Sequence, residues 1–298
     1  KNKIDKLASG EKEWILTSAW RNDVVNSDDY RAYVGGTSGL IYGYVNDGFY
    51  TVADFESFDS KSRTWKLKEG VVDSSPLSDT PRPGNAKFKK LTPVDPNSTN
   101  PYQLTEADRT VIGNTTPKFS GGFGLNATYK GFDMSMFFNF MYDFDVLNAN
   151  KIMLTTWADN KENNFLMDIA SDKRWRNFDD MGNEIRYSPE VLAEFNKNAT
   201  MWNPTSIGRP ICMSYAVEDG SFLRLNSATL GYTLPSVWTK KVGLSKVRFY
   251  VSGNNLFTLT GYSGYDPEVN IATGLTPNID YNRYPRSRTY TFGAQLTF

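Results

Sequence analysis

The stretch FSGGFGLNATYKGFDMSMFFNFMYDF, from Phe119 to Phe144, decides the fold. Apolar and polar residues alternate along it in two runs, which is the period of a β-strand with two different faces. Lys130 and Gly131 join the runs. If these two residues form a two-residue hairpin loop, Tyr129 and Phe132 oppose each other and both apolar sets line one face. The sequence therefore predicts a long antiparallel hairpin.

The apolar face of this hairpin has the character of a membrane-spanning surface. It is about a dozen residues long and aromatic at its ends, which suits transmembrane strands of roughly 9 to 11 residues. The opposite face is small and polar, as the lumen of a barrel requires, and carries Ser120, Asn126, Thr128, Ser135 and Asn139. We predict that the apolar face contacts lipid through Phe123, Leu125, Tyr129, Phe132, Met134, Met136, Phe138 and Phe140.

Three further strands are predicted towards the C-terminus. The first lies in SFLRLNSATLGYTLP (221–235), where a shift in apolar parity indicates a bulge near Ser227. The second is VRFYVSGNN (247–255), and the third is TYTFGAQLTF (289–298). All three alternate apolar and polar residues, so the predicted fold is all-β.

Connection lengths predict the orientation of these strands. Outer-membrane barrels have short periplasmic turns and longer external loops. Here the short Lys130-Gly131 turn and the short 234–245 connection alternate with the long stretches 145–220 and 256–287. This pattern places the C-terminus on the periplasmic side and the long loops outside the cell.

The remaining segments give weaker patterns. EWILTSAW (13–20) and GLIYGYVNDGFY (39–50) are typical of strands, and 76–101 is rich in Pro, Asn, Ser and Lys, which favours an irregular external loop. Within the long loop, 164–175 and 188–199 are candidate short helices.

Composition excludes several classes of function. The 33 basic and 33 acidic residues balance, so no electrostatic footprint for nucleic acid exists. A mean hydropathy of −0.50 excludes a helical membrane protein, whereas aromatics at 14% suit the girdles of a barrel. There is no histidine, and Cys212 is the one cysteine, which excludes a His-based triad, a His-ligated metal and a CxxC site. We expect no enzyme activity, no cofactor and no metal.

Two acidic pairs resemble the carboxylates of acid–base catalysis. They are Glu106 with Asp108, and Asp179 with Asp180. Both pairs are interpreted as acids of solvated loops.

Six strings of the sequence together resemble the SusC/RagA-like TonB-linked outer-membrane transporters. They cover most of the chain and are GLIYGYVNDGFY (39–50), DRTVIGNTTPKFSGGFG (108–124), YKGFDMSMFF (129–138), VEDGSFLRLNSATLGYTLP (217–235), VRFYVSGNNLFTLTGYSGYDPE (247–268) and YPRSRTYTFGAQLTF (284–298). The resemblance implies a barrel of about 22 strands around a plug, a size known for outer-membrane transporters. It implies TonB-dependent import of oligosaccharides or peptides in Bacteroidota-type bacteria.

The resemblance also implies partners and a place in the whole protein. Residues 1–298 would be the C-terminal segment of the receptor barrel, with the signal peptide, the plug and earlier strands upstream of Lys1. The implied partners are a SusD-like lipoprotein, the TonB-ExbB-ExbD complex through the upstream part, the barrel-assembly machinery and outer-membrane lipid. Nucleic acid is not among them.

Two sets of candidate site residues follow from this resemblance. The terminal strand resembles the signal that the barrel-assembly machinery recognises, through Tyr290, Phe292, Leu296 and Phe298. The loop GYSGYDPE and the long loop supply candidates for contact with a ligand or with the lipoprotein lid, namely Tyr262, Tyr265, Asp266, Glu268, Trp157, Trp175 and Trp202. Loop aromatics also pack loops onto one another.

One departure from the family concerns calcium. Family members often carry an EF-loop-like acidic stretch before the DRTVIG string, and here that region reads KKLTPVDPNSTNPYQLTEADR. Asp95 and Asp108 remain as oxygen ligands, but the spacing that wraps calcium is lost.

An alternative stays open: a secreted, soluble β-sandwich that binds carbohydrate through loop aromatics. In a sandwich one sheet face is buried against a partner sheet and the other is charged, whereas a barrel is apolar outside and small and polar inside.

Overall fold

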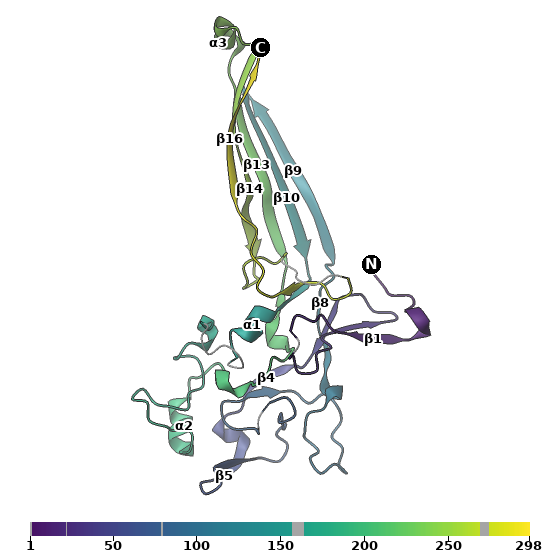
Figure 1. Cartoon of the computed structure of the whole chain (residues 1–298), viewed down its shortest axis with the longest axis vertical. Coiled ribbons are helices and arrows are strands. Elements are labelled where there is room, and N and C mark those ends of the chain that lie inside the picture. The colour runs from purple at the N-terminus through teal and green to yellow at the C-terminus, as the bar shows by residue number, and fades with distance from the viewer. Residues whose placement is uncertain (1, 22, 79, 157–163, 269–273) are drawn as a thin grey trace.

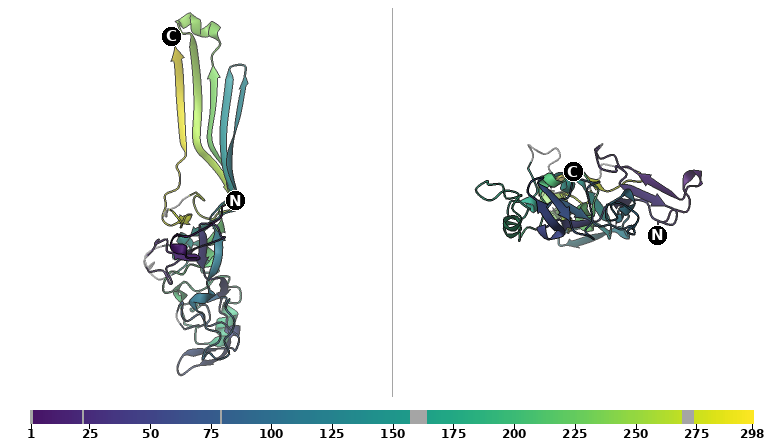
Figure 2. Two further views of the ribbon diagram at one scale, coloured as in Figure 1. Left: turned by 90° about the vertical axis from the view of Figure 1, so that its right-hand side faces the viewer. Right: turned by 90° about the horizontal axis from the view of Figure 1, so that it is seen from below.

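A computed structural model describes residues 2–21, 23–78, 80–156, 164–268 and 274–298 of the chain. The molecule is elongated. A tall sheet, which has five strands, forms one end, and a region of loops, short strands and short helices forms the other (Figure 1). The C-terminus and helix α3 (Ser236–Thr239) lie at the end of the sheet that is far from the loop region (Figures 1 and 2).

The tall sheet consists of β9 (Phe119–Tyr129), β10 (Phe132–Tyr142), β13 (Phe222–Thr233), β14 (Lys246–Thr260) and β16 (Thr289–Thr297). The strands of the loop region are short: β1 (Glu13–Leu16), β2 (Tyr30–Tyr33), β3 (Leu40–Gly43), β4 (Asn46–Phe49), β5 (Phe55–Asp59), β6 (Thr64–Leu67), β7 (Ala86–Phe88), β8 (Thr110–Asn114), β11 (Asp145–Asn148), β12 (Val217–Asp219) and β15 (Ile279–Asp280). The α-helices are α1 (Ala149–Met153), α2 (Pro189–Phe195) and α3 (Ser236–Thr239).

The β9–β10 hairpin has the predicted two-residue turn. Lys130 and Gly131 both have positive φ angles, 46° and 88°, which is the geometry of a type I′ turn and matches the twist of the flanking strands. Tyr129 pairs with Phe132, and the register continues without a shift to Phe119 and Tyr142. The predicted hairpin and its register are therefore confirmed.

The five tall strands pair antiparallel in the order β16-β14-β13-β10-β9. The register shifts between Leu225 and Ser227 on β13, which confirms the bulge predicted near Ser227. Strand β14 is longer than predicted and continues to Thr260, because the same irregularity, in which Asn255 has a φ of 52°, interrupts its alternation. The predicted final strand is confirmed as β16.

Cross-strand pairing extends the two faces of the hairpin over the whole sheet. One apolar row runs through Tyr129, Phe132, Tyr232, Phe249 and Ala294. The neighbouring row on the other face is polar or small and runs through Thr128, Asp133, Gly231, Tyr250 and Gly293. The apolar face is open, since Phe123, Leu125, Tyr129 and Phe132 are all exposed.

This sheet is part of a large antiparallel transmembrane barrel and not half of a sandwich. Within the described residues no second sheet lies over either of its faces (Figures 1 and 2). Among these residues β9 has a strand neighbour only in β10, and β16 only in β14. A segment of barrel wall has an apolar outer face and a polar inner face, and its two edge strands lack a neighbour on one side.

The loop region contains the buried core. Its larger sheets have the orders β1-β2-β3-β8 and β12-β11-β15, and Leu147 of β11 pairs in parallel with Ile279 of β15. The predicted helix at 188–199 is present as α2, which begins with Pro189 at its first turn. Residues 164–175 form only a 3-10 turn at Met167–Ile169, and 76–101 is irregular apart from β7.

Of the helices that the structure describes, none combines the length and the apolar character needed to cross a membrane.

Candidate functional site

The loop GYSGYDPE is fastened to the sheet wall by a buried ion pair. Strand β13 carries Arg224 on the polar face at its loop-side end, and the guanidinium is buried. Nη2 of Arg224 donates to Oδ1 of Asp266 at 2.5 Å and Nη1 donates to Oδ2 at 3.2 Å. This two-bond geometry suits arginine and no other side chain.

Glu268 extends this ion pair. Its Oε2 lies 3.2 Å from Nη2 of Arg224 and 3.3 Å from Nη1 of the more exposed Arg286. Burial raises the pKa of Asp266, but the hydrogen bonds and charge of Arg224 outweigh it and hold the pKa below its usual value. Asp266 is therefore ionised at neutral pH, and its ion pair with Arg224 holds the loop down.

A second anchor holds the same loop. The hydroxyl of Tyr262 donates to Oδ2 of Asp280 at 2.8 Å, and Nδ2 of Asn150 donates to Oδ1 of Asp280 at 3.1 Å. The Tyr262 ring packs with the buried Phe144 and Phe222. Burial raises the pKa of both Tyr262 and Asp280, so the tyrosine keeps its proton for this hydrogen bond.

Both anchors leave the tip of the loop free to make contacts. Tyr265 lies between the fastened residues and is 86% exposed. Of the four candidates predicted in this loop, Tyr262 and Asp266 are buried in anchoring roles, Glu268 is mostly covered, and Tyr265 is presented outward. Direct contact with a ligand or lid stays a prediction for all four.

A hollow of about 470 Å³ lies in the long loop and combines guanidinium groups with aromatic rings. Arg176 donates from Nη1 to Oδ1 of Asp180 at 2.6 Å, and its guanidinium lies 4.4 Å from the ring centroid of Phe195. Its wall includes Arg174, Trp175, Arg176, Phe178, Arg186 and Asn203. Such a mixture of planar donors and apolar rings suits sugar hydroxyls, carboxylates or peptide groups.

Two of the three candidate tryptophans of the long loop, Trp175 and Trp202, are packing residues in this structure. Trp175 is buried against Phe49, with ring centroids 5.8 Å apart, and only part of it reaches the hollow. Trp202 is buried, donates from Nε1 to the Thr155 carbonyl at 3.2 Å and meets the ring of Tyr215. Trp157 lies outside the described residues.

Asp108 is fully buried, so its interpretation as a solvated loop acid is wrong. Its carboxylate accepts hydrogen bonds from the backbone N–H groups of Leu91, Thr92 and Thr105, at 2.9, 2.7 and 2.8 Å. The hydroxyls of Thr92 and Thr105 donate to it as well, at 2.6 and 3.1 Å. Burial opposes ionisation, but these bonds together hold the pKa of Asp108 well below its usual value.

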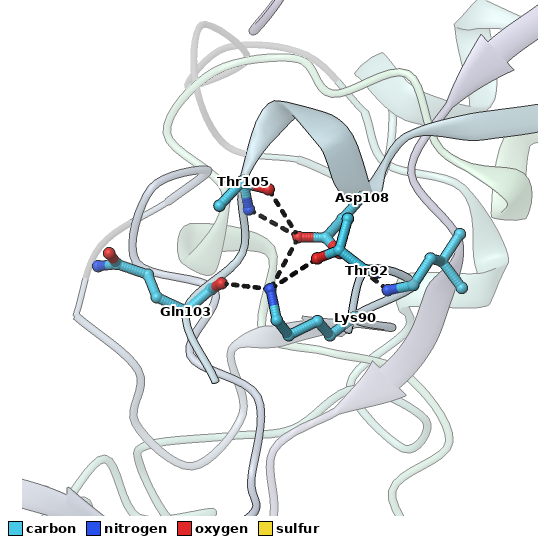
Figure 3. A network of polar contacts seen from close by, with 6 residues as sticks. Lys90, Thr92, Gln103, Thr105 and Asp108 are labelled. Carbon is cyan, nitrogen blue, oxygen red and sulfur yellow. Dashed lines mark hydrogen bonds and ion pairs between the residues drawn. The ribbon is translucent and has the colours of Figure 1, made fainter. Parts of the chain in front are cut away.

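The ammonium of Lys90 lies beside Asp108 among oxygen atoms (Figure 3). Nζ is 3.3 Å from Oδ2 of Asp108, 2.9 Å from Oγ1 of Thr92 and 3.0 Å from the carbonyl oxygen of Gln103. Asp95 is exposed and accepts from the backbone N–H of Asn97 at 2.9 Å. In the part of the chain that the structure describes, no group of three or more acidic, histidine or cysteine residues is arranged to bind a metal.

Four charged residues of these networks are not predicted from the sequence: Lys90, Arg224, Asp280 and Arg286. A basic residue inside an alternating strand was the one available signal, since Arg224 interrupts the apolar SFLRL string. The partners of the other three lie far away in sequence and no spacing rule connects them.

The amino-acid sequence is similar to those of known receptors. The chain is 32% identical to TonB-dependent receptor P3 of Formosa agariphila over 304 residues, which covers 100% of this chain and 26% of that protein. It is 38% identical to TonB-dependent receptor SusC of Bacteroides thetaiotaomicron over 88 residues, or 28% of this chain and 8% of SusC. The chain thus spans about a quarter of the length of the first receptor. No family model matches the chain.

Solved structures share the fold. The RagAB peptide importer in its open-open state aligns with a TM-score of 0.59 and 22% identity, covering 99% of this chain and 25% of the matched chain. The RagAB peptide transporter aligns with a TM-score of 0.60 and 21% identity, covering 99% and 26%. At this identity the likeness describes the fold of the chain.

Proposed function

The chain belongs to the TonB-dependent receptor family, and from this premise we propose that it forms wall strands and extracellular loops of an outer-membrane nutrient importer. The observation that carries the proposal is the two-faced sheet. Its apolar face suits lipid and its polar face suits a water-filled lumen, and both run across all five tall strands.

The rest of the barrel would come from the same receptor. Open strand edges are not tolerated in lipid, so β9 and β16 need further strands as neighbours. Residues 1–298 would be the C-terminal segment, with the signal peptide, the plug and the earlier strands upstream. The full barrel would have about 22 strands around that plug.

In this proposal the long loops are extracellular and the short turns are periplasmic. The loop region then belongs to the outer mouth of the barrel, where the fastened loop presents Tyr265 and the arginine-lined hollow presents Arg174 and Arg186. A SusD-like surface lipoprotein would cover this mouth. Substrates would be oligosaccharides or peptides, and the description of RagAB as a peptide importer supports the second class.

Energy for import would reach the receptor through the upstream segments. TonB with ExbB and ExbD would pull on the plug and open a path past the polar sheet face. This chain would form part of the barrel wall, line the lumen and contribute to the interface with the lid. The proposal assigns it no enzymatic activity. Its terminal strand β16 exposes Tyr290, Phe292 and Leu296, and Phe298 directly after the strand is exposed as well, which suits recognition by the barrel-assembly machinery before the wall is complete.

Cysteine labelling tests the lipid and lumen faces directly. The background is the full-length receptor in which Cys212 is replaced by serine. Two variants of it, Phe138→Cys and Asn139→Cys, carry their new thiol at adjacent positions of β10 and therefore at nearly the same depth. We expect the thiol of Phe138→Cys to be reached by a lipid-dissolved maleimide, and that of Asn139→Cys by a small water-soluble thiol reagent entering the lumen. Reversed labelling would contradict the assignment of the faces.

Fractionation of the source cells tests location. The native protein is expected in the outer-membrane fraction, with an intact mass well above the 33.7 kDa of this chain. Recovery only from the soluble fraction would contradict the importer.

A further inference from the structure

The turn-side end of the tall sheet concentrates positive charge. Lys130 lies in the β9–β10 turn, Lys240 and Lys241 lie in the β13–β14 connection, and Lys246 begins β14. The one acid in the five tall strands and their two short connections is Asp133. It is ion-paired with Arg248, so the four lysines far outnumber the acidic side chains at this end. The chain as a whole is neutral, so this basic end is a local feature.

The connection between β13 and β14 also exposes apolar side chains. Val237, Trp238 and Val242 are 68%, 60% and 71% exposed. Their presentation is built into the fold, because Thr239 is buried and its carbonyl accepts a hydrogen bond from the Leu244 N–H at 3.1 Å. A short connection facing only water has no reason to hold a tryptophan and two valines outward.

These exposed side chains lie at the same end of the sheet as an aromatic row. Tyr129, Phe132, Tyr232 and Phe249 follow one another across four strands at the turn-side end of the apolar face. The ring centroids of Phe132 and Tyr232 are 4.5 Å apart, and Nζ of Lys130 lies 5.2 Å from the ring centroid of Tyr129. Aromatic rings flanked by lysines are typical of the depth at which hydrocarbon meets headgroups, where lysine stems cover apolar surface and their ammonium groups reach the phosphates.

We infer that this basic aromatic end, defined by Lys130, Trp238, Lys240, Lys241 and Lys246, is a docking surface for anionic phospholipid headgroups of the leaflet on the short-turn side. Charge complementarity and continuity with the apolar face identify the occupant as lipid. The inference rests on the proposed function, since it requires the sheet to span a membrane. Its consequence is that the lysines and Trp238 fix how deeply the wall is inserted.

Lipid retention tests the charge part of the inference. The full-length receptor is placed in nanodiscs with equal amounts of phosphatidylglycerol and phosphatidylcholine, and the lipids that stay bound after extraction are counted by native mass spectrometry. The test variant replaces Lys130, Lys240, Lys241 and Lys246 with glutamine. The matched control replaces four exposed loop-region lysines with glutamine, namely Lys61, Lys66, Lys68 and Lys173.

We expect the test variant to lose its preference for phosphatidylglycerol by roughly fivefold or more, because each lysine near a membrane surface favours anionic lipid substantially. The control should keep the preference, and 1 M salt should weaken it in the unmodified receptor. Equal preference in test and control variants would overturn the inference.

Trp238 gives a second readout. Phospholipid brominated near the headgroup should quench part of the tryptophan fluorescence, and that part should disappear in Trp238→Phe but remain in Trp202→Phe, whose ring is buried. Unchanged quenching in Trp238→Phe would overturn the inference. A receptor that does not enter nanodiscs at all would instead contradict the proposed function.

Discussion

The guanidinium of Arg248 lies directly over the Cα of Gly231. Arg248 reaches from β14 across β13 to Asp133 of β10, where Nε donates to Oδ1 at 2.9 Å. A Cβ at position 231 would lie 2.6 Å from Nε of Arg248 and 2.6 Å from Oδ1 of Asp133. The glycine is needed here for lateral space on the polar face, and its backbone conformation is ordinary.

Gly231→Ala is therefore expected to push Arg248 off Asp133. The unfolding free energy should fall only modestly, since the pair is partly exposed to solvent. Gly261→Ala is the matched control, because nothing lies within 4 Å of its Cβ. The stability of each variant is measured as the guanidinium chloride concentration at which half of the reconstituted receptor is unfolded. Equal midpoints for the two variants would contradict the role of Gly231.

Arg224→Ala is expected to release the loop GYSGYDPE. It leaves Asp266 buried without its cation and Glu268 with only Arg286, a loss typically costing about 3–5 kcal/mol. Arg286→Ala should cost less than about 1 kcal/mol, because Arg286 is half exposed. Hydrogen exchange of residues 261–268 reports the opening. Similar protection in both variants would mean that Tyr262 alone holds the loop.

The Asp108 network is expected to be independent of calcium. Lys90 already supplies a cation beside the carboxylate, so neither millimolar calcium nor a chelator should shift the thermal unfolding midpoint. Asp108→Ala should cost about 3–5 kcal/mol, because it strands Lys90 and several buried donors. Asp95→Ala, at an exposed site, should stay within about 0.5 kcal/mol. A midpoint that falls when calcium is removed would contradict this account.

Asp29 and Asp266 are expected to respond to pH in opposite directions. Asp29 is buried, with Ser18 donating to both of its oxygens, and burial raises its pKa from 3.8 to about 6. The folded state therefore holds a proton that the unfolded state releases. Its stability contribution is fully present below about pH 4 and is lost as pH rises through 6, by up to about 3 kcal/mol.

Asp266 has a lowered pKa, so its contribution is present above the unfolded value and is lost as pH falls below it. Hydrogen exchange measured between pH 4 and 7.5, and corrected for the intrinsic exchange rates, separates the contribution of Asp29 from that of Asp266. Protection around Ser18 should decrease with rising pH and become flat in Asp29→Asn. Protection of 261–268 should increase or stay constant. The same slope in both segments would contradict the two assignments.

How far the sequence predicted the molecule depends on the range of the interactions involved. The β9–β10 hairpin, the bulge near Ser227 and the last strand follow from neighbouring residues, and all three are confirmed. Strands of the loop region were mostly missed, because β8 and β15 are five and two residues long and exist through distant partners. The same distinction holds for the candidate site residues. Tyr265 is exposed, as expected for a loop residue, whereas the burial of Asp108 depends on contacts with Lys90 and Thr92.

The long excursion of the chain between β10 and β13 suggests how related receptors can differ in their loops. Strands β10 and β13 are direct neighbours, yet the chain leaves the sheet at Tyr142 and returns only at Phe222, after building helices and short strands of its own. Closing a longer loop adds little entropy cost, about 0.6 kcal/mol for each doubling of length. The insertion can therefore be lengthened, shortened or exchanged while the strand pairing beneath it stays the same. A single set of wall strands can in this way carry many different loop surfaces, each obtained by replacing one excursion of the chain.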